Sequence, residues 1–280
     1  MSNAAFYKRS YHLTFTDEVT GVSRTYTNLD IKFNISRMIV QAKMEASIDV
    51  LGLSWNTINE ITATSIMSPP EARQLRKRVT LTAGYDGNEM ALFTGYISYA
   101  ICDPPPEMWL HMKADNYNED VSSQYQLSIA KGTRLKDVFN YAAKKIGFQP
   151  KWEYTGDNKE CSELLITCNS KTGIIKAIND LADWMVFYDN QFLFACDNRD
   201  KASVGTVNRN TGLIRVNKVD YVGVAFQTWI RNEYPLAAYV NLESELIPAA
   251  NGKYFIVSKT FNGHYRGNEW FTIYDCIRYH

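Results

Sequence analysis

The sequence has no excess of charge of either sign, because 30 lysine and arginine residues balance 30 aspartate and glutamate residues over 280 positions. Proteins that bind duplex nucleic acid normally carry a basic excess that displaces counterions from the phosphates. The balance therefore argues against nucleic acid as the main partner. We interpret the densest basic run as solvated cations at the end of a short helix predicted at residues 68–76; the run comprises Arg73, Arg76, Lys77 and Arg78.

Cysteine is scarce and odd in number, with five residues that form no CxxC pair and no metal-binding spacing with the four histidines. We therefore expect reduced thiols, although Cys161 and Cys168 could meet across a short hairpin. The N-terminus lacks a basic-then-apolar secretory signal, and no apolar run approaches the ~20 residues that cross a bilayer. We expect a chain that is assembled inside a cell and has no membrane span.

Motifs of catalysis are also missing, since the sequence contains no Walker A loop, HExxH, GxSxG or dinucleotide-binding GxGxxG. The histidines are far apart in sequence and are read as surface or partly packed residues: His12, His111, His264 and His280. Some carboxylates could pair in space, as in glycoside hydrolysis, but any globular chain contains such residues; examples are Glu60, Asp86, Asp115 and Asp183. We predict no catalytic residue, no cofactor site and no metal site.

The sequence is rich in apolar and aromatic residues. Hydrophobic residues make up 45% and aromatic residues 13% of the chain, which excludes wholesale disorder. The 18 tyrosines and six tryptophans fit either a surface that meets other proteins or the ordinary composition of β-sheets. The tryptophans are dispersed along the sequence, which argues against a sugar-stacking platform; they are Trp55, Trp109, Trp152, Trp184, Trp229 and Trp270.

Two β-hairpins are predicted, one toward each end of the chain. Residues 79–85 and 90–99 alternate apolar with polar positions and flank Asp86, Gly87 and Asn88, a turn that calls for positive φ at Gly87. Residues 254–257 and 270–274 flank a second polar stretch. We predict its turn residues as Asn262, Gly263 and Gly267.

The remaining pattern divides the chain into three parts. Alternating strands run through the first part, and residues 31–35 are one of them. Residues 56–66 are interpreted as a strand with a bulge because Ile58 and Ile61 fall out of phase. The middle shows helical spacing in two places. One helix, with Val138, Phe139 and Ala142 at helical spacing, lies between Thr133 as N-cap and Gly147 as C′ residue, and the other begins near Ser170 and reaches Met185. We expect the two helices to pack their apolar faces onto one small sheet, with Phe139 and Ile178 among the most buried residues.

After the polar segment that follows residue 197, strand patterns resume at residues 221–231, 237–242, 254–261 and 270–279. We predict an α+β, mainly β fold in which two small antiparallel β-barrel domains flank a small α+β module. The expected boundaries are residues 1–117, 118–200 and 201–280.

The order of these segments resembles the baseplate hub proteins of phage tails. The resemblance begins at residues 68–73 (SPPEAR) and continues through GYDGN at 84–88 and LFTGYI at 92–97. It then includes GTRLKDV at 132–138, LADWM at 181–185, TGLI at 211–214 and NGKY at 251–254. Each motif alone is of low specificity, but together they cover most of the chain in the right order. The family is similar to the hub part of type VI secretion spike proteins and to late control protein D.

The resemblance implies a structural protein without enzymatic activity, found in the virion at the tail baseplate of a contractile injection system and assembled in the host cytoplasm. It implies a homotrimer that adapts the hexameric tail tube to the trimeric central spike. Tape-measure protein and baseplate wedge are further expected partners, and genome DNA would pass the channel without sequence-specific binding. No cofactor is implied.

Two other functions remain open from the sequence. A tail-associated module that binds a carbohydrate or receptor would use exposed tyrosine and tryptophan as stacking platforms. A cell-wall hydrolase would need a catalytic constellation that the sequence does not display. The mass of the purified assembly would separate the hub from the binding module, because the hub predicts a trimer and the binding module a monomer.

Overall fold

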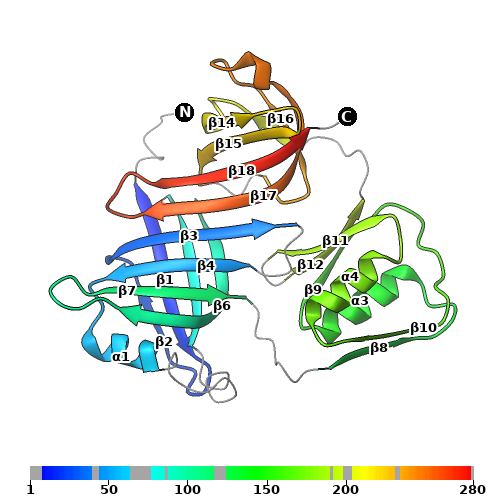
Figure 1. The fold of residues 1–280 in the computed structure, drawn as a ribbon, viewed down its shortest axis with the longest axis horizontal. Coiled ribbons are helices and arrows are strands. Elements are labelled where there is room, and N and C mark those ends of the chain that lie inside the picture. Colours follow the sequence, from blue (N-terminus) through cyan, green and yellow to red (C-terminus); the bar gives the residue numbers. More distant parts are fainter. Residues whose placement is uncertain are drawn as a thin grey trace. The chain divides into compact units, whose positions relative to one another are not determined.

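The computed structural model describes residues 8–39, 44–63, 77–85, 88–116, 124–189, 192–197, 204–230 and 234–278. The chain forms two compact units, which Figure 1 shows as ribbons. A β unit comprises residues 1–38, 43–118 and 203–280, and an α+β unit comprises residues 39–42 and 119–202. The predicted fold class, mainly β within an α+β chain, is confirmed.

The N-terminal part of the β unit contributes strands of regular alternation. They are β1 (Arg9–Asp17), β2 (Ser23–Tyr26), β3 (Asp30–Met38), β4 (Glu45–Leu51), β5 (Lys77–Tyr85), β6 (Asn88–Cys102) and β7 (Trp109–Asp115). In β1, the side chains of Tyr11, Leu13 and Phe15 are buried while those between them are partly or fully exposed. This period of two places one face of the pleated sheet against the core.

The C-terminal part contributes the rest of the same sheet. Its elements are β13 (Gly205–Val207), β14 (Leu213–Val219), β15 (Gly223–Trp229), β16 (Tyr239–Leu242), the 3₁₀ helix η3 (Pro248–Ala250), β17 (Gly252–His264) and β18 (Trp270–Arg278). Residues of β15 are buried on both faces from Gly223 to Thr228. β14 lies at one end of the sheet and is mostly exposed.

One seam joins the two parts into a sheet of 13 strands. β17 pairs with β3 in antiparallel register from Ser258↔Met38 to His264↔Lys32. On the outer face of this seam, the Asn34 side-chain amide donates to Asn262 Oδ1 at 2.7 Å. The main path of pairings runs from β14 to β2, with β16 paired to β17 and β13 paired to β16 off that path. No described pairing closes this path on itself, so the closure of each part into a barrel stays a prediction.

The two parts also share a hydrophobic core beneath the seam. The Trp270 ring from β18 is 1% exposed and contacts Phe33 of β3 edge to face, with ring centroids 5.3 Å apart. Its indole N–H donates to the Gly84 carbonyl of β5 at 3.2 Å. Arg9 of β1 lies over the same ring and also donates to the Gly267 carbonyl. Residues far apart in sequence therefore fold as one unit.

Residues predicted as a bulged strand at 56–66 form a helix where the structure describes them, α1 (Trp55–Ala63). Ile58 and Ile61 are buried because a spacing of three places both on the same helix face. Ser54 precedes the helix, and its hydroxyl accepts from the Thr57 amide at 3.3 Å, as an N-cap does. The prediction was wrong because two apolar residues three positions apart in a short segment fit a helix as well as a strand with a bulge.

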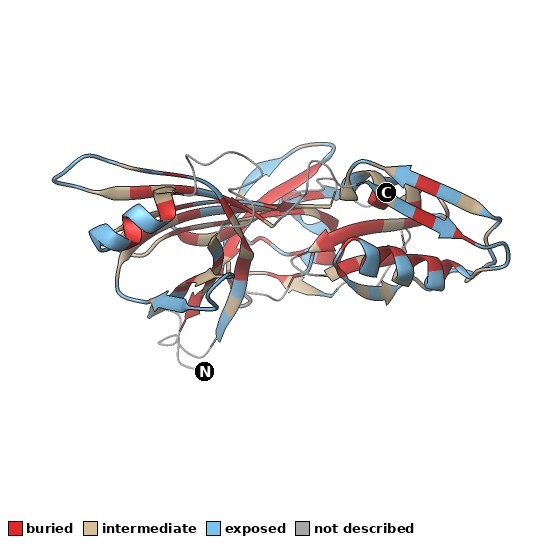
Figure 2. Ribbon diagram, turned by 90° about the horizontal axis from the view of Figure 1, so that it is seen from below, coloured by how far each residue is buried: buried red, intermediate tan, exposed pale blue. Residues whose placement is uncertain are grey.

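The α+β unit forms two small sheets covered by two helices. Its elements are β8 (Tyr125–Ile129), α3 (Leu135–Lys145), β9 (Gln149–Glu153), β10 (Leu164–Cys168), α4 (Lys171–Asn179), β11 (Trp184–Asp189) and β12 (Phe192–Asp197). β10 pairs with β8, while β11, β12 and β9 form a separate three-stranded sheet, so the single sheet predicted for this module is corrected to two. Phe139 and Ile178 are fully buried, as the helical spacing predicted. Figure 2 shows exposed residues along the outer faces of the helices.

The helix ends of this unit agree only in part with the sequence pattern. Arg134, and not the predicted Thr133, occupies the N-cap position of α3, while the Thr133 hydroxyl donates to the carbonyl three residues before it. Gly147 follows α3 with φ of +83°, as predicted for a C′ residue. α4 ends at Asn179, so Met185, predicted on this helix, lies in β11.

Candidate functional site

The residues predicted as structural turns fall in different places. Asp86 and Gly87 lie outside the described residues, and Asn88 begins β6, where it pairs with Tyr85. Asn262 and Gly263 lie within β17 and not in a turn, because β17 continues to His264. Gly267 lies in the connection between β17 and β18, where its amide donates to the His264 carbonyl at 3.1 Å.

Gly263 is a close-packing position and not a turn residue. It pairs with Phe33 on one side and with Trp270 on the other. A Cβ built on Gly263 would overlap the Phe33 ring. The glycine therefore lets an aromatic ring lie directly on the backbone of the seam.

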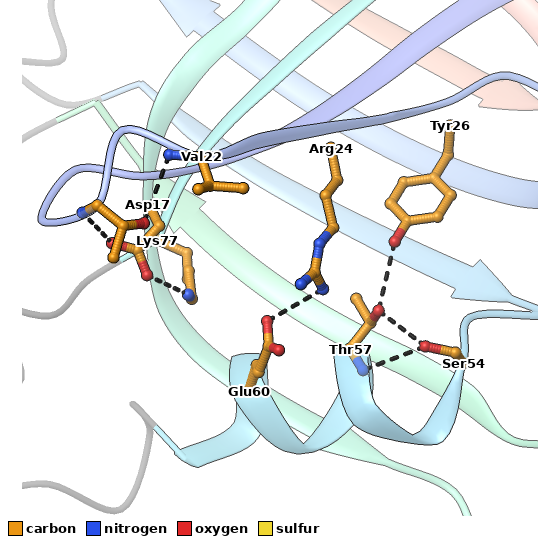
Figure 3. Close-up of polar contacts among 9 residues, drawn as sticks. Asp17, Val22, Arg24, Tyr26, Ser54, Thr57, Glu60 and Lys77 are labelled. Carbon is orange, nitrogen blue, oxygen red and sulfur yellow. Dashed lines mark hydrogen bonds and ion pairs between the residues drawn. The ribbon is translucent and has the colours of Figure 1, made fainter.

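A cleft with a volume of about 370 Å³ lies between the β1–β2 hairpin and α1 in the β unit. Its lining combines apolar side chains with two ion pairs: Phe15, Asp17, Thr20, Val22, Arg24, Thr57, Glu60, Ile61 and Lys77. Figure 3 shows that the polar groups of this cleft bind one another.

Asp17 uses both of its carboxylate oxygens inside the molecule. Lys77 Nζ lies 2.5 Å from Oδ2, and the amides of Val19 and Thr20 each donate to Oδ1 at 3.0 Å. The hydrogen bond from Lys77, followed by that from the Thr20 amide, holds the pKa of Asp17 well below its usual range. A carboxylate held ionised in this way is suited to fixing the β1–β2 turn and not to transferring protons.

The other polar pairs of the cleft tie the hairpin to α1. Arg24 Nη1 lies 3.2 Å from Glu60 Oε2, and the hydroxyls of Tyr26 and Thr57 are 3.3 Å apart (Figure 3). Both residues of the Arg24–Glu60 pair are nearly half exposed, so solvent screens the pair. These contacts position the hairpin against the helix, which gives the cleft a structural role.

Lys77 of the basic run and Glu60 of the scattered carboxylates line the same cleft. Of the run, Lys77 and Arg78 are described; Lys77 pairs with Asp17, and Arg78 Nη1 lies 3.9 Å from Glu18 Oε1. They begin β5 and neutralise acidic residues of the β1–β2 turn, while residues 68–76, predicted as a short helix, lie outside the described residues. Among the carboxylates, Asp115 ends β7 and Asp183 precedes β11.

His111 is the histidine that the fold surrounds with acidic groups. Its Nδ1 lies 2.9 Å from Asp49 Oδ1 on β4, and its Nε2 lies 3.0 Å from Asp103 Oδ2 after β6. The hydrogen bond to Asp103, and next that to Asp49, raises the pKa of His111. Sequence separation hid this cluster, because Asp49 and His111 meet only through the β4–β7 pairing.

Two tryptophans that are distant in sequence meet in the α+β unit. The Trp152 and Trp184 ring centroids are 5.6 Å apart, and Tyr154 lies 5.5 Å from Trp184. Phe139 packs on both indoles, and Trp184 is only 3% exposed. The dispersal inferred from sequence does not hold for this pair, but rings that pack face to edge on each other serve as a core and not as a flat platform.

Other chemistry is also limited in the described part of the chain. There, no group of three or more histidine, cysteine or acidic residues is arranged to hold a metal ion. Its five cysteines, Cys161 and Cys168 included, form no disulfide. Within the same residues, no helix has both the length and the apolar character required to span a membrane.

Comparison with known proteins gives a consistent result. The family model described as "Baseplate hub gp41" matches residues 12–276. No curated protein sequence matches this chain.

Solved structures with the same fold include two tail proteins. The tail protein from Neisseria meningitidis MC58 superposes with a TM-score of 0.64 at 9% identity, covering 96% of each chain. The 43 kDa tail protein of prophage MuSo2 from Shewanella oneidensis gives 0.62 at 8% identity, covering 95% of this chain and 98% of that one.

A third similar structure comes from a secretion system. The E. coli c3393 protein, described as a component of the type VI secretion system, gives a TM-score of 0.57 at 10% identity, covering 90% of this chain and 74% of that one. At these identities the likeness concerns the fold. Tail and secretion-system components thus share the arrangement of a β unit with an α+β unit.

Proposed function

This chain belongs to the baseplate hub gp41 family, and from that premise we propose that it is the structural hub of a phage tail baseplate, acting as a homotrimeric adaptor. The observation that carries the proposal is the family match itself, which extends over residues 12–276 and so includes both the β unit and the α+β unit. The fold likeness to two tail proteins, one of them from a prophage, supports it.

The adaptor role follows from symmetry. A hexameric tail tube and a trimeric spike cannot make equivalent contacts directly, so a trimer that presents two similar β regions per chain can satisfy both. The seam between β3 and β17 supports this role because it places the two β regions in one sheet. We propose the tail tube protein and the central spike protein as partners, with tape-measure protein and baseplate wedge as further ones.

The proposal places the chain in the virion, after assembly in the host cytoplasm. Genome DNA would pass through the hub channel without sequence-specific contacts, which fits a chain of no net charge. No catalytic step is part of the proposal, and the pairing of Asp17 with Lys77 in the cleft is consistent with a structural role.

Light scattering coupled to size-exclusion chromatography tests the proposal directly. The hub predicts a particle of three times the 32.1 kDa chain mass, with formation of a stable complex when tail tube protein is added. A particle of one chain mass that binds oligosaccharides or host receptor would instead support the carbohydrate- or receptor-binding alternative.

A phage-based assay complements the mass measurement. A phage with an amber codon in this gene should make no complete tails in a non-suppressing host, and the wild-type chain supplied in trans should restore them. Normal tails without the protein would contradict a hub role.

A further inference from the structure

His111 on β7 lies between two carboxylates that come from different parts of the β unit. Its Nδ1 is 2.9 Å from Asp49 Oδ1 on β4, and its Nε2 is 3.0 Å from Asp103 Oδ2 in the connection that follows β6. Both ring nitrogens can donate at the same time only when His111 is protonated, since a neutral imidazole has a single N–H. The arrangement is therefore complete with a cationic His111.

Loss of a proton from His111 leaves one of the two aspartates without its donor. The remaining N–H still bonds one carboxylate, while the lone pair of the deprotonated nitrogen faces the other carboxylate and repels it. The hydrogen bond to Asp103, and next that to Asp49, raises the pKa of His111. The stability that this cluster contributes is therefore fully present below the ordinary histidine pKa of about 6.5 and is lost as pH rises through the higher folded value.

Asp49 has a second cation within reach, Lys32 on β3. Lys32 is directly opposite Asp49 in the antiparallel β3–β4 pairing, and Asp49 is directly opposite His111 in the β4–β7 pairing. Opposite residues of neighbouring strands point to the same face with Cβ atoms about 5 Å apart, so a lysine side chain can span the gap. Asp49 thus lies between two side chains that can each neutralise it.

In this structure Lys32 contacts an aromatic ring. Its Nζ lies 4.2 Å from the centroid of the Trp109 ring, and Trp109 is two residues before His111 on β7, which places both on the same face. A cation–π contact at a partly exposed indole and an ion pair at a partly exposed carboxylate are of similar, small strength. A change of one charge beside Asp49 can therefore exchange one contact for the other.

Other charged groups surround His111 at greater separation in the register. On β6 the residue opposite His111 is Ile101, which carries no charge. Lys113 is one pair further along β7, opposite Ser47. The described charged groups that face His111, Asp49 or Lys32 from the surrounding elements are Asp30, Asp103, Glu107, Lys113 and His264. Of the cations among them and Lys32, Lys32 is the one directly opposite Asp49.

We propose that Lys32, Asp49 and His111 form a proton-dependent switch on this face of the β unit. With His111 protonated, the imidazolium bonds both aspartates and Lys32 lies over Trp109. When Nδ1 loses its proton to solvent, Asp49 exchanges His111 for Lys32, and Lys32 leaves the indole. Nε2–H stays with Asp103, because Asp49 is the carboxylate that has a second cation opposite it. The His111 side chain is 41% exposed, so the proton passes directly to water.

Fluorine NMR of the full chain labelled with 5-fluorotryptophan tests the exchange. The Trp109 signal is assigned with Trp109→Phe, and the ring signals of His111 are assigned with His111→Gln in histidine-labelled protein. Between pH 6 and pH 9 the Trp109 signal should shift with the same midpoint as His111, and that midpoint should lie above the ordinary histidine value. A Trp109 signal that does not follow the titration of His111 would overturn the switch.

Variants separate the movement of Lys32 from a direct effect of the His111 charge on the indole. Lys32→Met should remove most of the Trp109 shift while His111 still titrates. A full shift in Lys32→Met would show that Lys32 does not move, and would overturn the exchange. Lys113→Met is the matched control, because it removes a lysine from the same face that is not opposite Asp49. It should keep the wild-type shift.

Two further variants test which groups sense the proton. Asp103→Asn and Asp49→Asn should each move the His111 midpoint to lower pH, because an amide does not favour the imidazolium as a carboxylate does. His264→Gln should leave the Trp109 shift in place, and its loss there would make His264 the sensor and overturn the role of His111. Thermal unfolding at pH 6 shows that each variant is folded.

The nitrogen that loses its proton is observable directly. Long-range ¹H–¹⁵N spectra of the His111 ring should show a bare Nδ1 and a protonated Nε2 above the midpoint. A bare Nε2 would mean that Asp103 is released in place of Asp49, which would overturn the exchange with Lys32. All these measurements are independent of the hub role, since a chain that forms no trimer can carry the switch and a trimer without the switch leaves the hub unaffected.

Discussion

At the scale of single residues, Gly263 shows how a backbone position can be decided by a distant side chain. The sequence predicts a turn residue there, whereas the fold places it in β17 beneath the Phe33 ring. Phe33 lies 230 positions earlier in the chain, so local pattern carries no sign of the contact. Gly263 is required by close packing within a strand and not by the conformation of a turn.

Gly263→Ala should therefore destabilise the β unit by about 1–3 kcal/mol, because the added methyl group forces the Phe33 ring out of its packed position. Chemical denaturation followed by tryptophan fluorescence measures the change. Gly205→Ala is the control, since a Cβ there would come no closer than 3.4 Å to Tyr234. Equal stability of the two variants would show that the seam can relax around Gly263.

Asp17 leads to a prediction about how the stability of the fold depends on pH. Its pKa is lowered in the folded chain, so the stability it contributes is present above its unfolded pKa of about 4 and is lost as pH falls through the acidic range toward the folded pKa. Asp17→Asn should lower the melting temperature at pH 7, and the difference from wild type should shrink below pH 4. Thermal unfolding at several pH values measures it.

Glu18→Gln is the matched control for Asp17. Glu18 is on the same turn, and its 3.9 Å contact with Arg78 is nearly half exposed and worth little. The Tyr96 hydroxyl donates to the Glu18 carboxylate at 3.1 Å, and the amide oxygen of glutamine can accept the same hydrogen bond. A constant melting difference for Asp17→Asn from pH 7 to pH 2 would contradict the role given to the carboxylate charge.

At the scale of elements, periodicity was informative where one face of a strand or helix is buried. The alternation of residues 31–35 gave β3, and the helical spacing of Val138, Phe139 and Ala142 gave α3, because each pattern reports which face meets the core. β14 was missed, since its residues are mostly exposed and no buried face imposes a pattern. α1 was misread because its nine residues contain too few buried positions to set the phase.

The buried face of α3 can be tested by truncation. Phe139→Ala should cost about 3–5 kcal/mol, because the side chain is fully buried against Trp152 and Trp184. Tyr141→Ala, on the same helix but 47% exposed, should cost far less. Hydrogen exchange of peptides from residues 124–197 measures the loss within this unit, and similar effects of both variants would contradict the assigned helix face.

At the scale of the whole molecule, the seam between β3 and β17 could not be predicted from the sequence. Residues of β3 and β17 are separated by more than two hundred positions, and no local signal reports which strands become neighbours. The same holds for the cleft, where Asp17 and Lys77 meet across the β1–β5 pairing, and for His111 between its two aspartates. The three-part division came from composition and order, but the shared core of the β parts came from tertiary packing alone.

Trp270 tests whether the N-terminal and C-terminal β regions unfold together. It belongs to β18, yet its ring packs on Phe33 and its indole N–H donates to Gly84, both from the N-terminal region. Trp270→Ala should cost about 3–5 kcal/mol and should weaken hydrogen-exchange protection equally in β3, β5 and β17. Trp55→Ala is the control, because Trp55 is 57% exposed on α1. Loss of protection confined to residues 204–278 would mean that the two regions fold separately, and the seam would then be a contact between domains and not part of one cooperative unit.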